Sequence, residues 1–133
     1  MLNDVFRELK RQSVVFHTEL IDDLLNYLDA ENGGFSEIPE DFFDRLAEAI
    51  NELEEKYKAG ELDPRGEDLL RTLRLLRRRL FEKRFSRLVR LAMAQVLGCN
   101  VELKGYRTSK EVEFYEKLVS FLSEFKREVL REG

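Results

Sequence analysis

The chain contains the stretch PRGEDLLRTLRLLRRRLFEKRFSRLVRLAMAQVL at residues 64–97. Pro64 and the acids at positions 67 and 68 suit the first turn of a helix, where proline loses no hydrogen bond and acids meet the positive end of the dipole. No Pro or Gly occurs between Gly66 and Gly98, and Gly98 can end the helix. The stretch therefore predicts one helix of about 30 residues, roughly 45 Å long at 1.5 Å per residue.

The apolar face of this helix changes direction at about Leu80. At 100° per residue, the first half forms one narrow face, and the second half forms another that is rotated by roughly 100°. The residues expected to pack are Leu69, Leu73 and Leu76 in the first half and Phe81, Phe85, Leu88 and Ala92 in the second. A helix of this kind packs against different neighbours at its two ends. Those neighbours belong either to this chain or, for one of the two faces, to another subunit, so these seven residues are the candidate subunit interface.

The same helix is basic inside an acidic protein. Residues 65–90 hold nine Arg and one Lys against three acids, whereas the whole chain has a net charge of -4. The candidate basic surface consists of Arg71, Arg74, Arg78, Lys83, Arg84, Arg87 and Arg90. One interpretation is that acidic and basic helices neutralise each other within the fold. The other is a patch for an acidic partner or for nucleic acid.

The rest of the chain also has helical spacing. Apolar residues recur at three and four positions in residues 2–12, 16–28 and 38–57, and Asn32-Gly33-Gly34 separates the second and third of these segments. Thr108 and Glu111 fit a capping box that opens a last helix. Its expected core stripe is Tyr115, Leu118, Leu122, Phe125 and Val129, widened by Phe114 and Phe121. The pattern predicts an all-α fold: one domain over residues 1–133, with four or five helices around the long arginine-rich one.

Composition narrows the function classes. No run of about 18 apolar residues could span a membrane, the first residues lack a signal-peptide pattern, and the single Cys99 has no partner for an internal disulfide, so we expect a cytoplasmic protein. One His and one Cys provide no zinc-ligand spacing and no Cys–His nucleophile, and no glycine-rich phosphate loop occurs. We expect His17 to be structural or exposed and Cys99 to be inert. The sequence predicts no catalytic residue, no metal, no cofactor and no small-molecule substrate.

Three segments, in this order, resemble the helical domain of a GINS subunit, a replication-factor family of archaea and eukaryotes. The first is Ile38-Pro39-Glu40-Asp41-Phe42-Phe43, which continues into Ile50-Asn51-Glu52-Leu53-Glu54. The second runs from Leu80 to Ala92 and is similar to the family pattern Arg-x-x-Lys-Ile-x-x-Leu-Ala, with Arg87 at the lysine position. The third is Thr108-Ser109-Lys110-Glu111-Val112-Glu113-Phe114-Tyr115.

The resemblance implies a non-enzymatic subunit of a four-part complex whose long helices pack across subunit interfaces. It also implies partners: other GINS subunits in a homo- or hetero-oligomer, the MCM helicase, and a RecJ-like protein, with DNA contact secondary. The order resembles the archaeal type, in which a small β-domain follows the helical domain; here only four residues, from Leu130 to Gly133, follow the last matching helix. We therefore expect a scaffolding subunit of a DNA replication complex.

Two other classes remain open. The first is a nucleic-acid-binding helical module that uses the basic helix at residues 65–90, although no aromatic interleaving and no helix-turn-helix signature accompany its arginines. The second is a small helical enzyme that binds a dianion through Arg71, Arg74 and Arg78.

Overall fold

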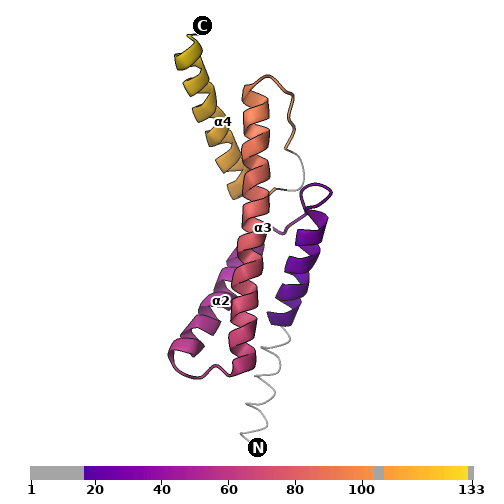
Figure 1. Ribbon diagram of the computed structural model, residues 1–133, viewed down its shortest axis with the longest axis vertical. Coiled ribbons are helices and arrows are strands. Elements are labelled where there is room, and N and C mark those ends of the chain that lie inside the picture. Colours follow the sequence, from indigo (N-terminus) through magenta and orange to yellow (C-terminus); the bar gives the residue numbers. More distant parts are fainter. Residues whose placement is uncertain (1–16, 104–106, 132–133) are drawn as a thin grey trace, which may run out of the picture.

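The computed structural model describes residues 17–103 and 107–131, and over these residues the fold is all-helical with no strand (Figure 1). A helix covers residues 17–30, and three more follow: α2 (Phe42–Lys58), α3 (Pro64–Val96) and α4 (Ser109–Leu130). The all-α prediction is confirmed. The helix expected within residues 2–12 lies outside the described residues. No helix in the described part of the chain combines the length and the apolarity that a membrane span requires.

α3 is the long arginine-rich helix, and it runs the length of the molecule (Figure 1). Asp63 caps its first turn by accepting a hydrogen bond from the Gly66 N–H at 2.7 Å. At the other end the chain turns at Gly98, whose φ of 104° lies in the region that favours glycine. Both predicted boundaries are confirmed within one residue, because local chemistry specifies each of them.

The first half of α3 packs against α2 and the helix over residues 17–30. This lower core is aliphatic apart from Phe42, whose ring meets Tyr27 edge-on at 5.0 Å. Its buried members are Leu20, Leu24, Ile38, Phe42, Leu46, Ala49, Ile50, Leu53, Leu70, Leu73, Leu76 and Leu80. Four of them come from α3, so the expected packing of its first half is confirmed.

The second half of α3 packs against α4 instead. This upper cluster is smaller: Leu88, Ala92 and Tyr115 are buried, and residues such as Phe35, Leu118 and Leu122 are packed around them while partly exposed. α3 therefore does change neighbours along its length, as predicted, and both sets of neighbours belong to this chain.

The buried face of α3 turns gradually rather than in one step. From Leu76 it continues through Leu80, Arg84, Leu88 and Ala92. Each step of four residues turns the face by about 40°, because 3.6 residues complete a turn. Phe81 and Phe85 were expected to pack either within this chain or against another subunit. The first alternative is wrong for both, since the drifting face passes beside them and both rings are exposed.

α4 opens with the predicted capping box, in which Thr108 and Glu111 each bond the other's backbone. Its apolar stripe is only partly used. Tyr115 is buried and Leu118 and Leu122 are half-buried, but the expected core residues Phe125 and Val129 are exposed. The physical reason is visible in Figure 1: α4 diverges from α3 toward its C-terminal end, so no element of the described chain covers those positions.

Candidate functional site

The structure separates the seven candidate interface residues into two groups. Leu73, Leu76, Leu88 and Ala92 are buried within the chain, and Leu69 packs against the lower core. Their apolar character is therefore explained without a partner. Phe81 and Phe85 are 57% and 43% exposed, so they alone remain on the surface as interface candidates.

These two rings line a groove at the place where α2, α3 and α4 meet. The groove encloses about 540 Å³, and its apolar lining, here called the aromatic groove, consists of Phe43, Phe81, Phe85, Leu88 and Phe114. Phe81 and Phe85 are stacked with 5.6 Å between ring centroids, and Phe114 lies 5.8 Å from Phe85. Five charged residues also line the groove: Glu40, Asp44, Arg84, Lys110 and Glu111.

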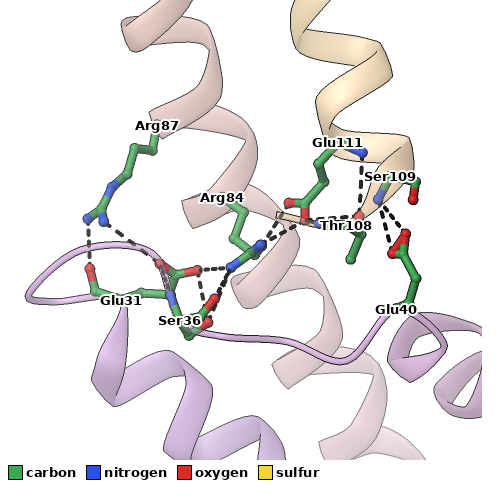
Figure 2. A network of polar contacts seen from close by, with 8 residues as sticks. All are labelled: Glu31, Ser36, Glu40, Arg84, Arg87, Thr108, Ser109 and Glu111. Carbon is green, nitrogen blue, oxygen red and sulfur yellow. Dashed lines mark hydrogen bonds and ion pairs between the residues drawn. The ribbon is translucent and has the colours of Figure 1, made fainter. Parts of the chain in front are cut away.

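Beside the groove, Arg84 connects three parts of the chain (Figure 2). Its Nε and Nη2 each donate to the Glu111 carboxylate at 2.7 Å, the paired geometry that suits guanidinium and carboxylate. Its Nη1 donates to Glu31 Oε1 at 2.8 Å and to the Ser36 carbonyl oxygen at 2.9 Å. Arg84 therefore attaches the first turn of α4 and the loop after residue 30 to the middle of α3.

Glu31 is almost fully buried and is held from several directions. Its carboxylate accepts from the backbone N–H and the hydroxyl of Ser36, both at 3.2 Å. Arg87 adds an Nη1 contact at 3.8 Å and donates from Nη2 to the Glu31 carbonyl oxygen at 2.7 Å. Nearby, the guanidinium groups of Arg84, Arg87 and Arg107 lie within 5.4 Å of the Phe35 ring centroid, as cation–π geometry requires.

Two groups of this cluster have shifted pKa values. Burial alone would raise the pKa of Glu111, but hydrogen bonds from Arg84 and Thr108, together with the Arg84 charge, hold its pKa below the ordinary value. Burial alone would lower the pKa of Arg84, but Glu111 and Glu31 raise it. The cluster is thus a buried ion network that joins helices, in which Arg84 and Glu111 each favour the charged form of the other.

The prediction that Arg84 belongs to a basic surface is wrong, because its side chain is 2% exposed and committed to Glu31 and Glu111. A sequence signal for this burial was present. Arg84 lies four residues from both Leu80 and Leu88, which places it on the core face of the helix. Its acidic partners lie 27 and 53 residues away and could not be identified from spacing.

Of the six other predicted basic residues, Arg87 is partly exposed and binds Glu31, and the remaining five lie in two rows on α3. In the first row each cation is exposed and paired with a different acid: Arg71 with Asp68, Arg74 with Glu54, and Arg78 with Glu82. This row therefore does not converge on one dianion site.

The second row consists of Arg79, Lys83 and Arg90, here called the basic row. It lines a separate open depression of about 570 Å³ together with Arg87, the polar residues Asn32 and Ser86, and the acids Glu31 and Glu82. Over the described residues no ion pair joins the basic row to an acid, although Lys83 donates to Asn32 Oδ1 at 3.3 Å. Arg79 was not among the predicted surface residues. Its helical spacing places it on the same face as Lys83 and Arg90, and this spacing could have identified it.

The remaining reactive side chains stand apart from these surfaces. His17 is buried in the first helix, and burial lowers its pKa. Cys99 is exposed just beyond the end of α3. Among residues 17–103 and 107–131, no three His, Cys, Asp or Glu side chains are grouped to hold a metal ion. Comparison of the chain with protein-family models, curated proteins and solved structures finds no match.

Proposed function

We propose that this chain is a non-catalytic helical assembly subunit of a DNA replication complex, similar to a GINS subunit, and that it scaffolds the MCM helicase and associated factors. The observation that carries the proposal is the aromatic groove. A chain that already buries a core of its own leaves Phe81, Phe85 and Phe114 exposed around one concavity. Contiguous exposed apolar surface of this kind is typical of protein–protein interaction sites.

The placement of the three GINS-like segments supports the same proposal. Glu40 of the first segment accepts from the Ser109 backbone N–H of the third, and Arg84 of the second binds Glu111 of the third. The segments that carry the resemblance thus meet at one side of the aromatic groove, and the ion network fixes their relative positions. On this proposal the protein works in the cytoplasm, needs no cofactor, and binds GINS-type subunits, an MCM helicase subunit and a RecJ-like protein.

The test is direct binding to these three classes of partner, measured by calorimetry or sedimentation. Phe85→Glu places a charge in the aromatic groove and is expected to weaken binding at least about 30-fold, the loss typical of an interface hot spot. Leu75→Glu is the matched control, because Leu75 is similarly exposed (48%) but does not line the groove. Circular dichroism must show both variants folded. Failure of the unaltered chain to bind any of the three would reject the proposal.

A nucleic-acid-binding module is the second candidate, and the basic row favours it. Arg79, Lys83 and Arg90 lie on one face of α3, form no ion pair with an acid of residues 17–103 and 107–131, and would attract phosphates. This function predicts salt-dependent binding of DNA or RNA that is lost in the triple variant Arg79→Glu, Lys83→Glu, Arg90→Glu. The same change at Arg71, Arg74 and Arg78 should reduce binding less, since those arginines already have acidic partners.

A further inference from the structure

The outer face of α4 carries a second apolar surface, continuous with the aromatic groove. Phe114, Leu118, Phe121 and Phe125 lie within about 60° of one another around the helix, and we name them the α4 seam. Phe121 and Phe125 are 68% and 59% exposed, and Phe114 belongs to both the seam and the groove. The spacing of four, three and four residues is that of the contact line in a coiled coil.

α3 covers this seam only in part. Phe114 lies 5.8 Å from Phe85 of α3, and Leu118 packs at the edge of the upper cluster, whereas Phe121 and Phe125 stay exposed. The other contacts of α4 with α3 involve Tyr115 and residues such as Val119 and Leu122, which lie around the helix from the seam. Val129 and Leu130 extend the exposed apolar surface to the C-terminal end of α4. A helix that is apolar on two faces needs two neighbours, and the described chain provides one.

We propose that the second neighbour is α4 of another copy of this chain, lying antiparallel across the seam. The inference rests on the proposed assembly function and specifies one partner for it. Alignment of Phe114 with Phe125 and of Leu118 with Phe121 matches the seam with itself. Such self-matching is the requirement for a two-fold symmetric interface.

Charges along the edge of the seam select the antiparallel direction. Lys110 and Lys117 occupy the N-terminal half of α4, and Glu124 and Glu128 occupy the C-terminal half. Antiparallel pairing brings Lys117 close to Glu124 and Lys110 close to Glu128, whereas parallel pairing places these side chains on opposite sides of the interface, where they do not meet. The present contacts of the lysines, Lys117 with Glu113 and Lys110 with Asp44, are between exposed side chains and cost little to exchange.

The same alignment fills the aromatic groove. Beyond Phe114, the second copy's Val129 reaches the groove lined by Phe81 and Phe85, and its Arg131 approaches the acids Glu40 and Asp44. Each copy thus inserts the end of its α4 into the groove of the other. This single arrangement would cover both the exposed rings of α3 and the exposed residues at the end of α4.

The first experiment measures self-association of the full chain by sedimentation equilibrium. We expect a dimer whose dissociation constant rises at least about 30-fold in Phe121→Glu, as at an interface hot spot, and stays unchanged in Leu75→Glu. Circular dichroism and thermal melting check that both variants fold. A chain that remains monomeric at all concentrations, or a Phe121→Glu variant that still dimerises normally, overturns the proposal.

A charge exchange tests the direction independently of the apolar residues. Lys117→Glu and Glu124→Lys should each weaken the dimer, and the double variant should recover it, because every contact then has both charges reversed. Weakening that persists in the double variant overturns antiparallel pairing.

Cross-linking tests the register. In a Cys99→Ser background, Lys110→Cys mixed with Glu128→Cys should form a disulfide between chains. Either variant alone should not, since the identical positions lie about 25 Å or more apart at 1.5 Å per residue. If each variant formed a disulfide with its own copy, and no disulfide joined the two variants in the mixture, parallel pairing would be established and the inference rejected.

These outcomes separate the inference from the proposed function. A monomer that binds an MCM helicase subunit rejects the antiparallel dimer and leaves the scaffold proposal standing. A dimer with the expected cross-link that binds no replication partner supports the dimer and rejects the scaffold proposal.

Discussion

The two halves of α3 differ in how far the apolar side chains around them are buried. The lower half meets two helices and buries an aliphatic core with α2 and residues 17–30. The upper half packs against α4, where Leu88, Ala92 and Tyr115 are buried. Exposed rings remain on both helices: Phe81 and Phe85 on α3, and Phe121 and Phe125 on α4. Between the two halves lies the ion network of Arg84, Glu31 and Glu111 (Figure 2).

The difference indicates that the two halves of α3 have different roles. The lower half contains most of the buried apolar surface, which is the main favourable contribution to folding. The upper half presents apolar surface that would be stabilised by a partner. The ion network fixes the direction of α4, and therefore the shape of the aromatic groove, without adding apolar area.

Arg84→Ala should break the connection between the two halves. It leaves the Glu31 and Glu111 carboxylates without their principal counter-charge, and removal of one partner of a buried ion pair destabilises by about 3–5 kcal/mol. Urea unfolding followed by circular dichroism measures the change. Arg78→Ala is the control, since the exposed pair of Arg78 with Glu82 should contribute less than about 1 kcal/mol. Equal losses in both variants would contradict a special role for the network.

Leu73→Ala should show how much the lower core contributes to the free energy of unfolding. Leu73 is completely buried, and truncation of a buried leucine costs about 2–5 kcal/mol. Leu75→Ala, two residues away but exposed, should change the free energy of unfolding by no more than about 0.5 kcal/mol. A similar small effect at Leu73 would show that the lower half is not the main source of stability.

Acid should weaken the network through Glu111. Its pKa is lower in the folded chain than its ordinary value of 4.5, so its ionised form stabilises the fold above that pH, and this contribution is lost as the pH falls through the folded pKa. Stability should therefore decline below about pH 4.5. Glu111→Gln should be less stable at neutral pH and should lose less on acidification. Parallel pH profiles for the two proteins would show that Glu111 is not responsible.

Phe121→Ser should have the smallest effect on the isolated chain. The ring is mostly exposed, so its removal should change the unfolding free energy of the monomer by no more than about 0.5 kcal/mol. Thermal melting at a concentration low enough to exclude self-association measures this. A loss comparable to that of Leu73→Ala would mean that the upper half stabilises the monomer after all.

Local signals in the sequence determined both ends of α3, the start of α4 and the change of neighbours along α3. They did not determine the start of α2, which begins at Phe42 and not at Ile38 as the pattern predicted. Asp63 caps a donor three residues away, and the Thr108–Glu111 box also spans three residues, so both signals are contained in one turn. The spacing of leucines likewise reports a direction around the helix whatever the neighbour is. These features depend on local backbone chemistry and helical periodicity, which a single sequence displays.

Only the tertiary structure decided which side chains are covered. Arg84 was counted with the basic surface because its carboxylate partners, Glu31 and Glu111, come from distant segments. Phe125 and Val129 were assigned to a core because their periodicity cannot show where α4 departs from α3. Burial depends on contacts between residues far apart in the chain. The long helix was therefore predictable in extent, while its buried arginine and its exposed rings emerged only when the helices were placed side by side.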